Sequence, residues 1–237
     1  MVPTLSLRTT LFRFVQQQCT RHHIDDSHGL IHSKRCVSWV DTMTVNDNTL
    51  SADEKTVAVY SAAIHDLCDK KYVSAFESIA ELREWLIHHE TENPDLRQEV
   101  REAILSIIQT MSYSYLNQRK HSDGTNWYPD HGAWIRSYHL ARQADLLEGL
   151  HVGRCYLYTK HAFPQYNEEE IWFRVEELFK KRMYHYVTDG WITNPVAMEH
   201  APLLIEEAKT CFRTRVWDYS ASASALYTFG HLKRRFL

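Results

Sequence analysis

The chain has 237 residues, 44% of them hydrophobic, and a formal net charge of -3 at pH 7. This length suits one large domain with its own core, and the small net charge excludes a chain-wide surface for nucleic acid or another polyanion. Five scattered cysteines without a CxxC pair indicate reduced thiols in a cytoplasmic protein, and no apolar run is long enough to span a bilayer, so no membrane partner is expected.

The first predicted helix covers residues 8–20. Residues on its apolar face are Leu7, Leu11, Phe14, Val15 and Cys19. Because the first 24 residues carry no acid, a mitochondrial targeting segment is the alternative interpretation. The apolar spacing favours the core helix.

Further helices are predicted near 28–43, 53–67, 75–89, 95–111, 134–150, 168–188 and 195–211. Seven Gly and six Pro are few for this length, and segments with strand-like alternation are absent. We therefore expect an all-α fold, a single-domain helical bundle.

Several helix starts carry capping signals. Ser or Asn side chains accept hydrogen bonds from the free N–H groups of a first helical turn, and a glutamate three residues later completes a capping box. The predicted boxes are Ser51–Glu54 and Ser74–Glu77, and the predicted asparagine caps are Asn93, Asn167 and Asn194.

The predicted helix at 53–67 differs from the others because residues 56–64 are apolar or small on nearly every face. Such a helix belongs in the centre of a fold. His65 and Asp66 follow at its C-terminal end. Since unpaired buried charge is costly, these two residues need partners, and a metal ion would satisfy both.

The segment 112–133 is the longest predicted loop, because it is polar and aromatic and contains Gly124, Pro129 and Gly132. A loop of this length within a domain is often a lid or a binding loop. The residues after 212 are basic. We therefore predict one domain over 1–212 and a basic tail over 213–237 that either packs on the domain or is partly disordered.

Three segments carry residues suited to metal chemistry: 25–36, 65–72 and 143–155. They contain His28 and His32 four residues apart, the His65–Asp66 pair, and Asp145 in an apolar helical pattern. Two imidazoles and two carboxylates suit one divalent ion of Mn, Fe, Co, Ni or Zn, with Mg as a further option, and leave positions open for water and substrate.

In these segments the chain resembles the HD-domain superfamily of metal-dependent phosphohydrolases, in particular small bacterial members with nucleotide pyrophosphohydrolase activity. DDSHGLIHSKR resembles the family's D-x-S-H-x-x-x-H-x-x-R, and HDLCDKKY resembles H-D-I-x-D-x-K-F. IIQTMSYSY is similar to I-I-x-x-I-S-F-S, and QADLLEGLHVGR to D-A-D-R-L-D-A-x-G-x-x-G-x-R. Four segments in the right order are more specific than an HD dipeptide.

The resemblance implies roles residue by residue. It implies metal binding by His32, His65, Asp66 and Asp145. Asp69 matches a catalytic carboxylate beside the metal, Arg35 and Lys71 match basic residues that bind substrate, and Arg154 matches a basic position without an assigned role. Gln143 and Leu146 depart from the family's Asp and Arg, which leaves the substrate open.

The implied function is hydrolysis of a nucleotide or another small phosphate ester by a metal-activated water. The alternatives are an HD-fold di-iron oxygenase and a non-catalytic HD scaffold that binds a nucleotide, and homo-oligomerisation stays open. Simpler interpretations also stand for single residues. Asp69 could pair with Lys70 or Lys71, Arg35 could be a solvated helix residue, and His28 could orient a ligand or lie on the surface.

Overall fold

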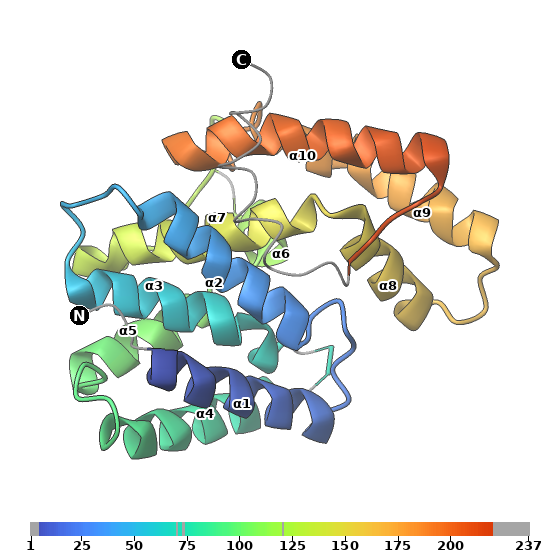
Figure 1. Ribbon diagram of the computed structural model, residues 1–237. Coiled ribbons are helices and arrows are strands. Elements are labelled where there is room, and N and C mark those ends of the chain that lie inside the picture. Colours follow the sequence, from blue (N-terminus) through green and yellow to red (C-terminus); the bar gives the residue numbers. More distant parts are fainter. Residues whose placement is uncertain (1–4, 70, 73, 120, 220–237) are drawn as a thin grey trace.

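The computed structural model describes residues 5–69, 71–72, 74–119 and 121–219, and these residues form helices without a β-strand (Figure 1). The predicted all-α class is therefore confirmed. The elements are α1 (Leu5–Arg21), α2 (Leu30–Thr44), α3 (Ala52–Ile64), η1 (His65–Cys68), α4 (Ala75–Glu90), α5 (Gln98–Ile108), α6 (Tyr113–Asn117), η2 (Gly132–Trp134), α7 (Ile135–Gly149), α8 (Val152–Ala162), α9 (Glu168–Lys181), η3 (Met183–His185) and α10 (Pro195–Thr214), where η marks a 3₁₀ helix.

Helix α3 lies at the centre of the core. Every residue from Thr56 to Ile64 is buried, which confirms the prediction from its all-round apolar sequence. Helices α2, α5 and α7 pack around it (Figure 1). The capping box at its start is present, because Glu54 N–H donates to Ser51 Oγ at 3.1 Å and Ser51 N–H donates to Glu54 Oε2 at 2.8 Å. The C-terminal end of α3 thus leads into the interior of the protein.

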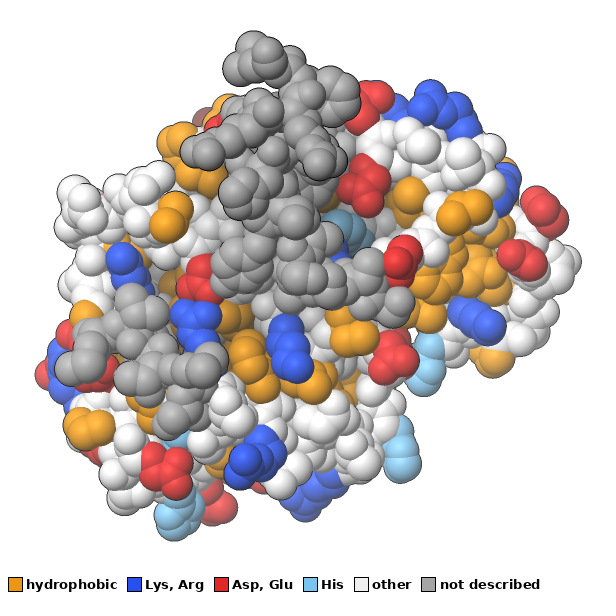
Figure 2. Space-filling model, in the orientation of Figure 1, with side chains coloured by type: hydrophobic (Ala, Val, Ile, Leu, Met, Phe, Trp, Pro, Cys, Tyr) orange, Lys and Arg blue, Asp and Glu red, His pale blue; other side chains and the backbone are white. Residues whose placement is uncertain are grey.

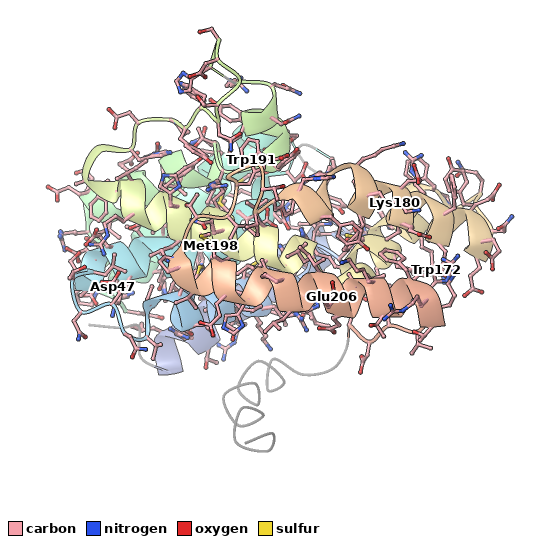
Figure 3. All side chains as sticks on the ribbon, turned by 90° about the horizontal axis from the view of Figure 1, so that it is seen from above. Asp47, Trp172, Lys180, Trp191, Met198 and Glu206 are labelled. Atoms are coloured by element: carbon pink, nitrogen blue, oxygen red, sulfur yellow. The ribbon has the colours of Figure 1, made fainter. Side chains whose placement is uncertain are left out.

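The other helices flank the group formed by α2, α3 and α7. Helix α1 packs on α2 and α3, α4 packs on α5, and α8 packs on α7 and α9. Helix α10, which carries Met198 and Glu206, crosses α7 and α2 (Figure 3). After α10 the chain returns to α8, where a Cβ on Gly153 would come within 2.6 Å of Trp217 and 2.9 Å of Tyr219.

The capping predictions are confirmed at three helices and wrong at two. Asn167 forms a capping box with Glu170, and Asn194 caps α10. Ser74 precedes α4, but its side chain accepts no capping bond. Asn93 caps no helix, because α5 begins only at Gln98; its Oδ1 accepts from Asp95 N–H at 3.3 Å, and its Nδ2 donates to the Tyr60 hydroxyl at 3.1 Å.

Several predicted boundaries also change. The predicted helix at 168–188 ends at Lys181 and is followed by η3, and the predicted loop at 112–133 contains α6 and begins η2. Helix α8 was not predicted. Its sequence begins with Val152 and Gly153 and continues with aromatic residues, which have modest helix propensity, so packing on α7 and α9 stabilises it.

At the N-terminal end, α1 has the predicted inner face, since Leu11, Phe14, Val15 and Cys19 are buried; Leu7 is half-buried. Of the predicted basic tail, 220–237 lie outside the described residues. On the face in Figure 2, basic and acidic side chains are interspersed. No helix in the described part of the chain is long and apolar enough to cross a membrane.

Candidate metal centre

The first histidine of the centre lies on the buried side of α2. His32 has no exposed surface, and Cys36, one helical turn later, is equally buried. Helix α2 begins at Leu30, so His28 lies in the turn before the helix. Its spacing of four residues from His32 had suggested a position on the same helix. The two rings are nevertheless neighbours, with centroids 6.2 Å apart.

His65 and Asp66 lie on η1 and not at the end of an α-helix. Ile64, with φ -114° and ψ 2°, marks the change from α3 to the 3₁₀ helix. His65 Nδ1 lies 3.0 Å from the Ala62 carbonyl oxygen. Because a carbonyl only accepts, Nδ1 donates this hydrogen bond, and the bond turns Nε2 towards the centre, as is common for histidines that bind metals.

Asp145 on α7 completes the quartet that the sequence predicted. His32 Nε2 lies 3.3 Å from His65 Nε2, 3.2 Å from Asp66 Oδ2 and 3.5 Å from Asp145 Oδ1. His65 Nε2 lies 3.4 Å from Asp66 Oδ1 and 3.6 Å from Asp145 Oδ1. Donor atoms bound at about 2.0–2.2 Å to one ion have such separations. The chain therefore brings all four predicted ligands together from three elements.

Two oxygen atoms of the quartet support a fit to a cation. Asp66 Oδ2 and Asp145 Oδ1 are buried and accept no hydrogen bond. Buried polar atoms usually have a partner, so such orphaned oxygens need an explanation. Arg154 on α8 lies nearby, with Nη2 3.6 Å from Asp66 Oδ2 and Nη1 3.2 Å from Asp145 Oδ1. The buried His, Cys and Asp groups could hold a metal ion.

The electrostatics of the centre favour positive charge. Burial alone would lower the pKa of His65, but the carboxylates of Asp66 and Asp145 outweigh it and raise that pKa to about 9. Burial would raise the pKa of Asp145, but Arg154 and the two histidines hold it well below its usual range. For the Cys36 thiol, burial and then the Asp145 carboxylate raise the pKa.

Asp69 and Lys71 form an ion pair next to Asp66. Lys71 Nζ is 3.1 Å from Asp69 Oδ2, and the lysine side chain is 47% exposed. Asp69 also belongs to a second group with His28 and Asp66, whose ligand atoms all lie within 4.8 Å of one another. The ion pair with Lys71 is the simpler role that the sequence allowed for Asp69, and it coexists with a position beside Asp66. Lys70 lies outside the described residues.

Arg35 is buried away from solvent in an ion pair with Glu148 of α7. Its Nε donates to Glu148 Oε2 at 2.9 Å, and its Nη2 lies 2.6 Å from His151 Nε2. Trp39 Nε1 donates to the same carboxylate at 3.1 Å. The structure thus gives this guanidinium a protein partner, and the substrate-binding role implied by the sequence stays a prediction.

Sequence reasoning missed Cys36 and left Arg154 without a role. The spacing of four residues from His32 was the available signal for Cys36, because residues four apart share one face of a helix. Arg154 lies on the unpredicted helix α8, and its Nε donates to the Ser27 carbonyl at 2.8 Å. His28 is tied to Ser27 Oγ at 2.7 Å and to the Tyr72 hydroxyl at 3.1 Å.

Comparisons with protein-family models, with curated proteins and with solved structures found no match for this chain.

Proposed function

We propose that the chain is a metal-dependent phosphohydrolase of the HD-domain type, acting on a nucleotide or another small phosphate ester. One observation carries this proposal: the Nε2 atoms of His32 and His65 lie 3.2–3.6 Å from each other and from the carboxylates of Asp66 and Asp145, whose buried oxygens have no hydrogen bond. When bound, a divalent ion polarises a phosphoryl oxygen and lowers the pKa of a water molecule towards neutrality.

Arg154 is the residue best placed to bind the phosphate. Its guanidinium lies within 3.6 Å of both Asp66 and Asp145, and its Nε is fixed on the Ser27 carbonyl. A cation bound to the two carboxylates would weaken their attraction for the two Nη groups of Arg154. A guanidinium can then donate two parallel hydrogen bonds to phosphoryl oxygens. Arg154 would thus offset the charge that develops on the phosphate.

Asp69 is the candidate for accepting a proton. Its carboxylate lies beside Asp66 and His28, and Lys71 balances its charge at 3.1 Å. A carboxylate in this position can accept the proton of an attacking water or hold that water in line. Lys71, half-exposed, can contact a phosphate group as a point charge.

The test combines metal content with product analysis. The purified protein is expected to hold one divalent metal ion per chain and to release phosphate or pyrophosphate from members of a nucleotide panel. Pyrophosphate from triphosphates would indicate attack at the α-phosphorus, and orthophosphate from monophosphates a nucleotidase. Asp66→Ala should lose metal and turnover, whereas Asp41→Ala, which removes an α2 carboxylate paired with Arg8 outside the centre, should keep both. If Asp66→Ala retains both metal and full turnover, the proposal is wrong.

A second function, a di-iron oxygenase, is favoured by one specific observation. His28, Asp66 and Asp69 form a second group of possible ligands that shares Asp66 with the quartet. Such a pair of adjoining groups could hold two ions. Two iron atoms per chain and oxygen-dependent turnover would favour the oxygenase, and one metal per chain would count against it.

A further inference from the structure

Arg142 on α7 is a buried cation without an anionic partner among the residues that the structure describes. The residue is only 1% exposed, and its Nε and Nη1 atoms donate no hydrogen bond. Its Nη2 lies 3.4 Å from His139 Nδ1, which carries no negative charge. Buried charges are normally paired, because removing an ion from water is costly. The proposed hydrolysis makes no use of this arginine.

The surroundings of Arg142 supply hydrogen-bond donors and aromatic rings. Tyr138 lies one helical turn earlier on the same face of α7, and its buried hydroxyl has no hydrogen-bond partner. Burial, Arg142 and His131 lower the pKa of His139 to about 4, so this imidazole is neutral at pH 7. Burial also lowers the pKa of Arg142, but a guanidinium stays charged at pH 7. This part of α7 therefore offers one positive charge, two unused N–H groups and one unused hydroxyl.

The ring of Tyr128 covers the guanidinium. The Arg142 Cζ atom lies 4.7 Å from the centroid of this ring, and the Tyr128 hydroxyl donates to the Gly190 carbonyl at 3.2 Å. Tyr128 is half-buried and belongs to the loop predicted at 112–133. A cation–π contact is much weaker than the cost of burying an unpaired ion. Tyr128 thus shields one side of the guanidinium without balancing its charge.

We propose that Arg142 binds a phosphate group at a second site, outside the quartet, when the Tyr128 ring moves aside. Guanidinium groups bind phosphate oxygens through charge-assisted hydrogen bonds. A tetrahedral oxyanion has enough acceptor atoms for both unused N–H groups of Arg142 and for the Tyr138 hydroxyl. The phosphate group comes from inorganic phosphate or from a nucleotide. Because no metal ion takes part, this site goes beyond the proposed function and does not depend on it.

Thermal unfolding of the metal-free full chain tests the site. The probe is inorganic phosphate, whose Kd is measured by calorimetric titration, and sodium chloride at the same ionic strength is the reference. Phosphate at 100 times its Kd should raise the Tm of the wild type by about 5–10 °C. Arg142→Met should lose this rise, and Arg136→Met, which replaces an arginine of α7 paired with Asp47, should keep it. No rise in the wild type, or a rise that persists in Arg142→Met, would overturn the proposal.

The chloride reference separates an anion site from a structural role of Arg142. Without phosphate, Arg142→Met should unfold at the same Tm as the wild type or at a higher one, because an apolar side chain of similar volume removes an unpaired buried charge. A lower Tm would show that the cation–π contact with Tyr128 stabilises the fold, and would overturn the proposal.

Two further measurements use a chain that keeps Arg142. Tyr128→Ala removes the covering ring and should bind phosphate about 2–5-fold more tightly than the wild type, because no cation–π contact has to be broken first. Equal or weaker binding would overturn the proposed entry of phosphate past this ring. A nucleoside monophosphate identifies the source of the phosphate group. Binding that is tighter than that of inorganic phosphate and is lost in Arg142→Met indicates a nucleotide, and weaker binding indicates free phosphate.

Discussion

Replacing Arg35 by Met should destabilise the protein by about 3–5 kcal/mol, because the substitution leaves the Glu148 carboxylate buried without its cation. Glu148 has no exposed surface, and it accepts hydrogen bonds from Arg35 Nε and Trp39 Nε1. Met fills a similar volume to the Arg stem, so little of the loss comes from packing.

The pKa of Glu148 gives an independent magnitude. Burial would raise it, but His151 and Arg35 outweigh burial and lower it from 4.5 to about 2. That difference corresponds to about 3 kcal/mol of stability, which His151 and Arg35 supply together with His151 as the larger contributor. Since the folded-state pKa lies below the unfolded one, this stability is present above about pH 5 and is lost as the pH falls towards 2.

Urea unfolding monitored by circular dichroism measures the effect. Arg35→Met should lower the free energy of unfolding by about 3–5 kcal/mol, which for a chain of this size is a fall of about 10 °C in Tm. The double variant Arg35→Met, Glu148→Leu should recover most of the loss, because it leaves no buried charge unpaired. A loss below about 1 kcal/mol for Arg35→Met would refute the reasoning and would favour the substrate role that the sequence implies for Arg35.

Three further outcomes follow from the structure. A bound divalent ion at 100 times its Kd should stabilise the wild type by about 2.7 kcal/mol in thermal unfolding, and Asp145→Ala should abolish that gain; an equal gain in the variant would contradict the site. Gly153→Ala should lower the free energy of unfolding by about 1–3 kcal/mol and change the tryptophan fluorescence, because the new Cβ would lie 2.6 Å from Trp217. Unchanged stability and fluorescence would contradict that contact. Ser51→Ala should lower the free energy of unfolding in urea by about 1 kcal/mol. Ser74→Ala should leave it nearly unchanged, because the Ser74 side chain forms no capping bond; equal losses would contradict the assigned caps.

The capping signals show which parts of the fold the sequence predicts. The cap at Ser51 depends on contacts within four residues, so it can be recognised locally. Asn93 offers the same local signal, and its Oδ1 accepts from Asp95 N–H at 3.3 Å, but no helix begins there because α5 starts only at Gln98. Helix α8 was missed for the converse reason, since contacts with α7 and α9 stabilise a segment of modest propensity.

The candidate site likewise has a part that the sequence predicts and a part that only the fold shows. The quartet could be predicted because each ligand lies in a recognisable short segment, and the structure brings the four together. Cys36 required the fold, because a single buried cysteine is usually a core residue. Cys36 follows His32 by one helical turn, and this spacing brings its Sγ to 3.4 Å from His32 Nε2.

The two arginines show why chemistry cannot be assigned from residue type and neighbourhood alone. Arg35 and Arg154 both flank the predicted ligands in the sequence, and both are cations in the interior. Arg35 meets a carboxylate that lies outside the quartet, so a metal ion in the centre leaves its pairing intact. Arg154 meets Asp66 and Asp145, the carboxylates that a metal ion would neutralise. A bound metal ion would therefore change the electrostatic surroundings of Arg154 far more than those of Arg35, and of the two arginines only Arg154 would gain hydrogen-bonding capacity for a phosphate.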